Sequence, residues 1–152
     1  MFRLKKVDIR EILSLIKESD KEKAFLPSVS DGSFSVENFF SENSEKISLY
    51  GSFLDTKLIG FLSLISEEDD LISIGPMYIS KKFRGQRFGE KQIEEAIDKV
   101  KRTNIKGIKT RTWGENKASR KIFENLNFKL VEEKPNTRIN GDSTVKYYLE
   151  LT

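Results

Sequence analysis

The sequence predicts one mixed α/β domain in which helices cover both faces of a central, mostly antiparallel sheet of six to seven strands. Three consecutive runs of β-forming residues, at 47–53, 58–65 and 71–79, are joined by short polar turns, as in an antiparallel meander. An amphipathic helical segment then leads to another strand at 105–113. Because a strand–helix–strand unit of this kind is normally parallel and right-handed, the sheet is expected to be mixed.

The N-terminal part predicts a strand followed by two helices. Phe2–Val7 alternates apolar and charged residues, which is typical of a half-buried strand. Asp8 is the predicted N-cap of the next helix, and Glu11 is its capping-box partner. The apolar residues that follow at helical spacing are Ile9, Ile12, Leu13 and Ile16. Residues 20–34 are polar and predict a loop, and residues 35–40 predict a second short helix.

Two features of the meander depart from regular strand patterning. Gly75-Pro76 interrupts the third strand, and because proline cannot donate to a ladder, a bulge or an unpaired edge is expected there. Glu67–Asp70 is a run of four acids, which an extended strand would direct to both faces. A solvated hairpin tip is therefore favoured over a metal site for this run.

The C-terminal part predicts a strand, a helix and two more strands. In the strand at 105–113 the alternation is impure, with Ile108, Thr110 and Thr112 facing opposite to Lys109, Arg111 and Trp113. Asn116 is the predicted N-cap of the last helix. The runs 128–133 and 143–151 predict the final strands, and Asn140-Gly141 indicates a tight reversal between them.

Composition restricts location and partners. The chain has 152 residues, enough for one domain with a real core, and we expect residues 1–152 to form that single domain. Its net charge of +3 is spread over both signs, which argues against nucleic acid as a partner. No apolar run reaches the roughly 18 residues of a membrane helix, and the first residues are charged. These features predict a cytoplasmic protein without a membrane partner.

The absence of cysteine and histidine restricts the chemistry. It excludes cysteine nucleophiles, Ser–His and Cys–His pairs, disulfides and zinc sites built from these residues. No calcium-loop pattern is present, so no metal is expected. Catalysis would depend on carboxylates, tyrosines, lysines, hydroxyls, backbone amides or water.

The segment Leu71–Val100 predicts an anion site. A strand leads into the basic turn 84–89, which holds Gly85 and Gly89, and then into an amphipathic helix. Backbone amides and the helix dipole at such a helix start form a site for a phosphate. The turn lacks both the GxGxxG pattern of a dinucleotide fold and the pattern of a P-loop. The alternative is that both glycines serve only the turn and helix packing.

A second segment gives the anion site a family context. Residues 115–128 read ENKASRKIFENLNF, and the earlier segment reads ISKKFRGQRFGEKQIEEAI. Together, in this order and at this spacing, they resemble the GNAT superfamily of N-acetyltransferases. The family pairs an Arg/Gln-x-x-Gly-x-Gly/Ala turn with a later Asn-x-x-Ala…Tyr-x-x-x-Gly-Phe segment. The resemblance extends over nearly the whole chain.

The resemblance implies acetyl-coenzyme A as cosubstrate, held in a cleft where the adjacent parallel strands splay apart. The backbone of residues 86–90 would hold its pyrophosphate, and the end of the strand at 77–79 would pair with the pantetheine arm. Asn116 matches the family residue that reaches the cofactor arm. The expected cofactor-binding residues are Met77, Tyr78, Ile79, Arg84, Gly85, Gln86, Arg87, Phe88, Gly89, Glu90, Asn116 and Phe123.

Three positions depart from the family pattern. Arg87 stands where the family usually has glycine, which should crowd the turn but can add a phosphate contact. Asn127 replaces the glycine before the final Phe, and asparagine tolerates a left-handed C-cap. Phe123 replaces the tyrosine that is the family's candidate general acid, and a phenyl ring donates no proton.

The reaction implied by the resemblance is direct attack of a primary amine, on a small molecule or a peptide or protein, at the thioester. Because a free alkylamine has a pKa of about 10, it must lose a proton before attack, to a general base or a water chain. Tyr50, Tyr147 and Tyr148 are the catalytic candidates, and Tyr78, Glu67 and Glu68 are further candidates for the base. A backbone amide near Tyr78 or Ile79 could hold the oxyanion.

Two alternatives remain at this stage. Phe123 favours a non-catalytic acyl-coenzyme A-binding or regulatory module of the same fold, and the basic turn leaves nucleic-acid binding as a third reading. Substrate choice would come from residues 20–40 and the last hairpin, which carry no motif. The sequence gives no signal for oligomeric state, so a homodimer is left open.

Overall fold

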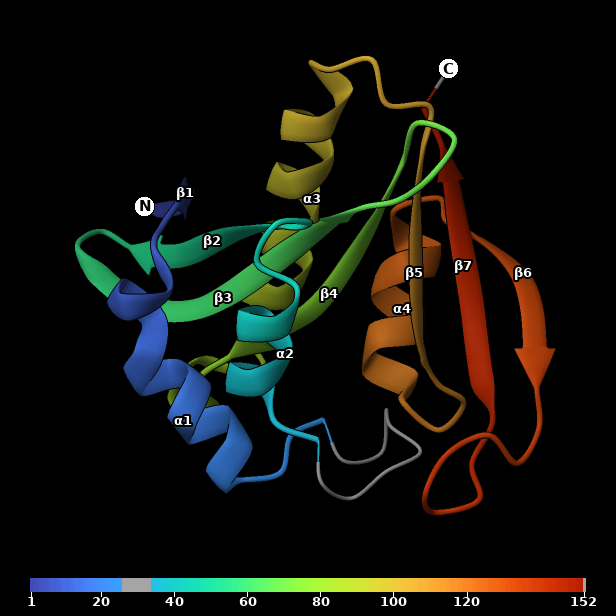
Figure 1. The fold of residues 1–152 in the computed structure, drawn as a ribbon, viewed down its shortest axis with the longest axis horizontal. Helices are drawn as coiled ribbons and strands as arrows, with labels where there is room; N and C mark the ends of the chain where they lie inside the picture. Colours follow the sequence, from blue (N-terminus) through green and yellow to red (C-terminus); the bar gives the residue numbers. More distant parts are fainter. Residues whose placement is uncertain (26–33, 152) are drawn as a thin grey trace.

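A seven-stranded sheet forms the centre of the molecule (Figure 1). The computed structural model describes residues 1–25 and 34–151, so much of the predicted loop at 20–34 lies outside the described residues. The strands are β1 (Phe2–Lys6), β2 (Ile47–Leu54), β3 (Lys57–Ser66), β4 (Leu71–Ile79), β5 (Gly107–Trp113), β6 (Lys129–Lys134) and β7 (Thr144–Glu150). The helices are α1 (Leu13–Lys21), α2 (Val36–Glu42), α3 (Phe88–Lys101) and α4 (Lys117–Asn125), with short 3-10 helices η1 (Ile9–Ile12) and η3 (Lys81–Phe83).

The strands lie in the order β1-β2-β3-β4-β5-β7-β6. Every neighbouring pair is antiparallel except β4 and β5, which are parallel and joined through α3. The mixed, mostly antiparallel sheet predicted from the sequence is therefore confirmed. The predicted irregularity at Gly75-Pro76 is confirmed as well, because the β3–β4 register shifts between Leu62 and Leu64 opposite this dipeptide.

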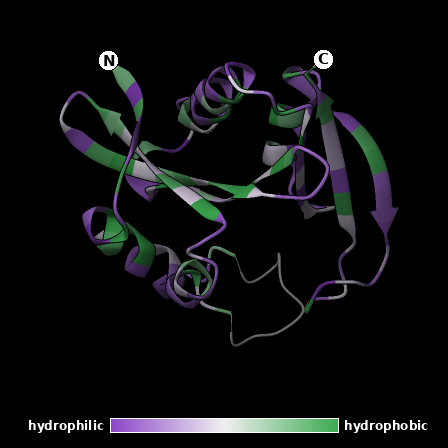
Figure 2. Ribbon diagram, turned by 45° about the horizontal axis from the view of Figure 1, so that its top comes forward, coloured by the Kyte–Doolittle hydropathy of each residue, from purple (hydrophilic) through white to green (hydrophobic). Residues whose placement is uncertain are grey.

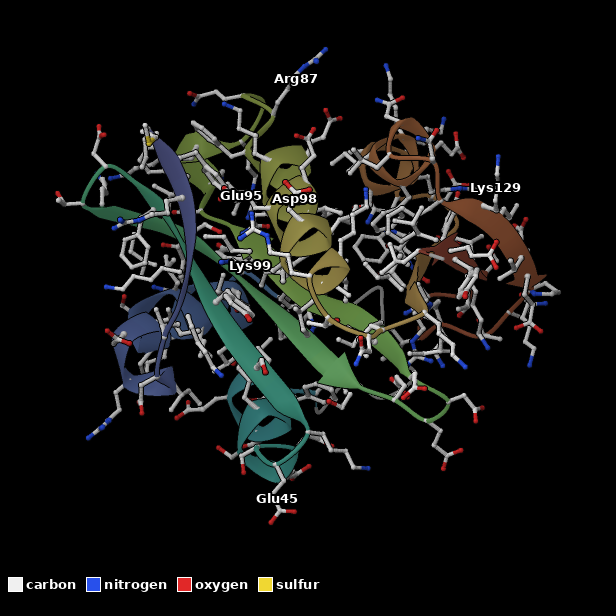
Figure 3. The ribbon with its side chains drawn as sticks, turned by 90° about the horizontal axis from the view of Figure 1, so that it is seen from above. Glu45, Arg87, Glu95, Asp98, Lys99 and Lys129 are labelled. Atoms are coloured by element: carbon white, nitrogen blue, oxygen red, sulfur yellow. The ribbon has the colours of Figure 1, made fainter. Side chains whose placement is uncertain are left out.

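Helices cover both faces of the sheet, as Figures 1 and 2 show. On one face, α1 and α2 pack against β3 and β4 through Ile12, Leu15, Ile16, Val36, Phe40, Phe61 and Tyr78. On the other, α3 and α4 pack through a core that includes Leu62, Ile93, Ala96, Ile97, Val100, Ile108, Phe123, Val145 and Tyr147. The sheet thus separates two apolar cores. Helix α3 also reaches the far strands, since Leu4 N donates to Glu95 Oε1 (3.4 Å) and the Lys99 ammonium lies 5.6 Å from the centre of the Tyr50 ring (Figure 3).

The predicted helix caps are confirmed. Asp8 accepts from Arg10 N (2.9 Å), and Glu11 accepts from Asp8 N (2.7 Å), so the capping box forms, although on η1 rather than on an α-helix. The side chain of Asn116 caps α4 as predicted, and that of Ser35 caps α2, for which no cap was predicted. Each cap satisfies a backbone amide that the helix itself leaves unpaired.

The tight reversal predicted at Asn140-Gly141 is present, as a turn within the connection between β6 and β7. The register pairs Lys134 with Thr144, so β6 and β7 are joined by the longer connection 135–143. Gly141 N donates to Arg138 O (2.9 Å), and Arg138 N donates to Asp142 O (3.1 Å). These bonds close a tight turn over residues 138–141, and Asn140-Gly141 lies within it.

A buried glutamine fastens α3 to the middle of the sheet. Gln92 is only 1% exposed, and its Nε2 lies within 3.2 Å of three acceptors: Ser52 Oγ, Phe61 O and Tyr78 O. Buried amides are retained where such bonds satisfy them. Gln92 therefore fixes the distance between α3 and the end of β4.

Candidate active site

The candidate site is a cleft between β4 and β5. These strands pair at three positions only, Leu71–Gly107, Ile72–Ile108 and Ser73–Lys109. Beyond them, β4 stays paired with β3 and β5 with β7, and a side-chain bond from Thr110 Oγ1 to Ile74 O (3.2 Å) spans the start of the gap. The cleft that opens there has a volume of about 1580 Å³. The expected splay of the parallel pair is confirmed.

The end of β4 presents backbone groups to this cleft. Ser80 N donates to Ile59 O (2.8 Å) on β3. Because successive residues of a strand direct their backbone groups to opposite sides, those of Met77 and Ile79 face the cleft. Ile79 O already accepts from Arg84 Nε (2.9 Å), which leaves Met77 and the Ile79 N–H at the open edge. An extended ligand could pair with this edge as an added strand does.

The basic turn before α3 leaves a row of backbone amides unpaired. Within the described part of the chain, no protein acceptor takes a hydrogen bond from the amides of residues 86–90. The helical ladder begins one residue later, where Lys91 N donates to Arg87 O (3.1 Å). These amides sit at the positive end of the 14-residue helix α3 and beside the cleft. Amides in this position favour an anionic ligand.

Gly89 keeps the space in front of these amides open. A Cβ at Gly89 would meet only Ile122 Cδ1, at an ordinary contact distance of 3.6 Å. The packing of the chain itself therefore does not demand glycine here. A ligand lying against the start of α3 would use that space.

Arg87 adopts the left-handed conformation that explains the family's glycine. Its φ is +66°, and its side chain extends from the start of α3 into solvent (Figure 3). The left-handed region costs a residue with a Cβ roughly 1 kcal/mol or more. The residue therefore adds a positive charge beside the free amides at the expense of backbone strain.

Replacing Arg87 by Gly should raise the free energy of unfolding by about 1 kcal/mol, because the backbone strain disappears. The same change should weaken coenzyme A binding about fivefold, because an exposed charge contact contributes roughly 1 kcal/mol. Urea unfolding and calorimetry measure the two effects. Arg87→Gln is the matched control, and we expect it to weaken binding without stabilising the fold. Equal stabilisation by Gln would contradict the strain argument.

Arg84 is exposed at the edge of the cleft, where contacts with β4 and with the end of α1 hold its side chain. Its Nε bonds Ile79 O, its Nη2 pairs with Glu22 of α1, and its guanidinium carbon lies 5.2 Å from the centre of the Tyr78 ring. The Tyr78 hydroxyl in turn donates to Glu18 Oε2 (2.7 Å). Arg84 thus connects α1 to the cleft edge of β4, a positioning role that the sequence did not indicate.

The surroundings of Tyr78 keep its proton in place. Burial and the hydrogen bond to Glu18 raise the pKa of Tyr78 well above its usual range. Ser80 Oγ donates to the same Glu18 oxygen (2.9 Å). Tyr78 is therefore a structural donor and not a base.

The Arg84–Glu22 pair should make stability depend on pH. Burial alone would raise the pKa of Glu22, but bonds from Arg84 and Tyr78 outweigh it and lower the pKa below the usual value. The stabilisation is then fully present above about pH 4.3, the unfolded value, and is lost as pH falls through the lower folded pKa. We expect Glu22→Gln to lower Tm at pH 7 and to approach the wild-type Tm below pH 4. Glu45→Gln, in the exposed α2–β2 turn (Figure 3), is the control and should leave Tm unchanged at both pH values.

The cleft, the open strand edge and the free amides agree with a family-model match. Residues 8–128 match the model of the acetyltransferase (GNAT) family. The chain belongs to the GNAT family. No curated protein sequence matches the chain closely enough to count as a relative.

Solved structures share the GNAT fold at low sequence identity. An N-acetyltransferase from Staphylococcus aureus Mu50 matches with a TM-score of 0.82 and 13% identity over 100% of this chain and 99% of that one. The ribosomal-protein-S18-alanine N-acetyltransferase from Escherichia coli matches with a TM-score of 0.79 and 14% identity, over 100% and 95%. A Bacillus subtilis acetyltransferase in complex with CoA matches with a TM-score of 0.76 and 16% identity, over 100% of both chains. At these identities the likeness establishes the fold.

Asn116 and Phe123 of the GNAT-like second segment line the cleft, and their side chains also contact neighbouring residues of the chain. Asn116 Oδ1 accepts from Ser119 N (3.3 Å), and its Nδ2 donates to Thr112 Oγ1 (2.8 Å). Phe123 is 1% exposed, with its ring centre 5.3 Å from that of Tyr147. Neither contact tests the expected cofactor roles, which stay predictions. The left-handed conformation expected at Asn127 is confirmed by its φ of +70°.

The three tyrosine candidates of this GNAT chain lie in different places. Tyr50 lies under Lys99 of α3, outside the residues that line the cleft. Tyr147 lines the cleft, but its hydroxyl accepts from Arg120 Nε (3.0 Å) and donates to Glu124 Oε2 (3.1 Å). Tyr148 also lines the cleft, on the opposite face of β7, with its hydroxyl 2.1 Å from the position that a Cβ of Gly107 would take. Two of the three tyrosines therefore line the cleft. The hydroxyl of Tyr147 is hydrogen-bonded within the fold, and that of Tyr148 packs close to Gly107.

Sequence reasoning missed two residues of the site. Glu18 joins Tyr78 and Ser80, and Arg138 of the β6–β7 connection lines the cleft with 7% of its surface exposed. Burial lowers the pKa of the Arg138 guanidinium, and the nearby Arg111 lowers it further. A buried arginine in a polar loop has no periodic signal, so only the folded connection reveals it.

Neither a membrane-spanning helix nor an acidic metal site is found among the described residues. No helix among them is long and apolar enough to cross a lipid bilayer. Residues 1–25 and 34–151 contain no group of three acidic side chains arranged to hold a metal ion. The cytoplasmic location and the absence of a nucleic-acid partner stay predictions. Whether the protein forms a homodimer stays open.

Proposed function

We propose that this protein transfers an acetyl group from acetyl-CoA to a primary amine, with both substrates bound in the cleft at once. The observation that carries the proposal is that one cleft contains both the unbonded amides of residues 86–90 and the open edge of β4. An acyl-CoA needs both, an anion site for its pyrophosphate and an extended edge for its amide-containing arm. Membership of the GNAT family supports the same ligand.

The chain's own groups fit acetyl-CoA as a cosubstrate. Residues 86–90 would hold the pyrophosphate, with Gly89 leaving room for it and Arg87 adding charge. Met77 and Ile79 would pair with the pantetheine arm. The thioester would then lie where β4 and β5 separate, next to Ile74 and Thr110. The solved GNAT structure with CoA supports this type of ligand.

The reaction is a direct displacement. The amine nitrogen attacks the thioester carbonyl carbon, the carbon–sulfur bond breaks, the amine loses a proton and the departing thiolate gains one. Of the two amides considered for the oxyanion, that of Ile79 faces the cleft, whereas alternation turns that of Tyr78 toward β3. Since the hydroxyls of Tyr78 and Tyr147 are already bonded within the fold, we assign the proton movement to water in the cleft.

A second candidate is an acyl-CoA-binding module without turnover. Phe123 favours it, because an apolar ring occupies the position of the family's proton donor and packs between Phe128 and Tyr147. Such a module would use the same amides and the same strand edge, so binding alone does not separate the two functions.

Free-thiol release from acetyl-CoA over a panel of amines separates them. The panel includes amino acids, polyamines, aminoglycosides and short peptides, since one GNAT structure of this fold is a ribosomal-protein N-acetyltransferase. We expect amine-dependent thiol release that Gly89→Glu abolishes. Stabilisation by acetyl-CoA without thiol release from any amine would favour the binding module. No stabilisation by any acyl-CoA would reject both functions.

A further inference from the structure

Arg138 carries two buried guanidinium nitrogens that the described residues leave without a hydrogen-bond partner. Its side chain belongs to the β6–β7 connection, 7% of the residue is exposed, and it lines the cleft. Among the described residues, neither Nε nor Nη2 of its guanidinium has a hydrogen-bond partner, although both atoms are buried. Buried guanidinium nitrogens are costly to leave unsatisfied, so such a group usually indicates a missing anionic partner.

The surroundings of Arg138 increase its need for an anion. Arg111 of β5 lies close enough to lower the pKa of the Arg138 guanidinium. Asp142 attracts Arg138, but its carboxylate already accepts from Ser143 N (2.7 Å) and Glu115 N (3.1 Å). Within the described chain, no carboxylate forms an ion pair with Arg111 or Arg138. Two neighbouring arginines therefore line the cleft, and neither forms an ion pair with a described residue.

The position of these arginines points to the acceptor and not to acetyl-CoA. Thr110 and Thr112 are buried, whereas Arg111 lies between them on the opposite face of β5. The buried face is the one covered by α3 and α4, so Arg111 lies on the face away from both helices. The free amides proposed for the pyrophosphate are at the start of α3. A second anion site on the other face fits the second substrate.

We propose that Arg138, assisted by Arg111, binds a carboxylate of the acceptor, so that the acceptor is an amine of the amino-acid class. A guanidinium presents two parallel N–H groups that match the two oxygens of a carboxylate. This inference rests on the proposed acetyltransferase function and adds the chemical class of the amine. It also gives the long β6–β7 connection a role in substrate choice.

The test compares carboxylates with their neutral counterparts. Thiol release is measured with the twenty common L-amino acids and with the corresponding amino-acid amides, in which only the carboxylate is removed. We expect the best amino acid to exceed its amide at least tenfold in kcat/KM. Arg138→Gln should bring this ratio close to one by raising KM with little change in kcat, and Arg111→Gln should act in the same direction with a smaller effect.

Matched variants separate a binding role from a structural one. Arg3→Gln makes the same change on β1, at the other edge of the sheet, and should leave the ratio unchanged. Arg138→Gln should keep the Tm of the ligand-free protein and its shift with acetyl-CoA, because it removes an unpaired buried charge. If Arg138→Gln does not fold, Arg138→Lys keeps the charge without the fork, and it should show an intermediate ratio.

Several outcomes would overturn the inference. Amides that react as well as amino acids would remove the carboxylate from recognition while leaving acetyl transfer intact. Preference for O-phosphoethanolamine over every amino acid would assign the anion site to a phosphate instead. An unchanged ratio in Arg138→Gln or Arg138→Lys would show that Arg138 does not bind the acceptor. Failure of the proposed function is recognised separately, because the wild type would then show no Tm shift with acetyl-CoA or no thiol release with any amine of the panel.

Discussion

Acetyl-CoA at one hundred times its dissociation constant should stabilise the wild-type protein by about 2.7 kcal/mol, and Gly89→Glu should abolish that stabilisation. For a domain of this size, the stabilisation corresponds to a rise in Tm of roughly 5–10 °C. The glutamate would place bulk and a negative charge in front of the unpaired amides of residues 86–90, where the pyrophosphate is proposed to lie. Thermal unfolding with and without acetyl-CoA measures the effect.

Two further substitutions at Gly89 give this prediction its controls. Gly89→Ala should keep most of the shift, because one methyl group meets only Ile122 Cδ1 in the chain, at 3.6 Å, and takes far less of the space left for the pyrophosphate than a glutamate does. Gly89→Gln has the size of glutamate without its charge, so the difference between the two isolates electrostatic repulsion. A full acetyl-CoA shift in Gly89→Glu would place the pyrophosphate elsewhere and would remove the central argument for the cosubstrate.

Local signals allowed most of the fold to be predicted from the sequence. The capping box at Asp8 and Glu11 and the cap at Asn116 depend on residues three positions apart, so they are visible in a linear sequence. Strand alternation likewise grouped Ile108, Thr110 and Thr112 on one face of β5, and this face is buried in the structure. The turn motif at Asn140-Gly141 marked where the last two strands reverse, but it does not report the register of the strands around it. That register is set by contacts along the whole of β6 and β7.

The parts of the site that are formed by backbone amides could be predicted from the sequence. The directions and contacts of its side chains could not. The amides of residues 86–90 follow from where α3 begins, which the glycines and the helical stripe indicated. Nothing in the sequence indicated that the Arg84 side chain bonds Glu22 and Ile79 O, and its expected contact with the cofactor stays a prediction. Arg138 gave no signal, because burial of a loop residue results from how distant segments meet.

The last prediction concerns Gly60, which keeps the cleft edge of β4 in place. A Cβ at Gly60 would lie 2.3 Å from Tyr78 O, 2.8 Å from Ile79 Cδ1 and 3.0 Å from Gln92 Nε2. A backbone oxygen in a central strand cannot move aside without shifting the strand. Gly60→Ala should therefore lower the free energy of unfolding by about 2–3 kcal/mol, at the upper end of overpacking effects. Urea unfolding measures the loss.

The same substitution should weaken acetyl-CoA binding, because the displaced segment includes Ile79, whose amide faces the cleft. Gly51→Ala, on the neighbouring strand β2, is the matched control. Its Cβ would lie 3.0–3.2 Å from the ends of three side chains, which can rotate away, so we expect a smaller loss of stability and an unchanged affinity. If Gly60→Ala lost stability but bound acetyl-CoA as tightly as the wild type, the edge of β4 would not hold the pantetheine arm. We expect the combination of lower stability and weaker binding in Gly60→Ala, and not in the control Gly51→Ala. This result would mean that the packing of β3 against β4 also sets the geometry of the cosubstrate site.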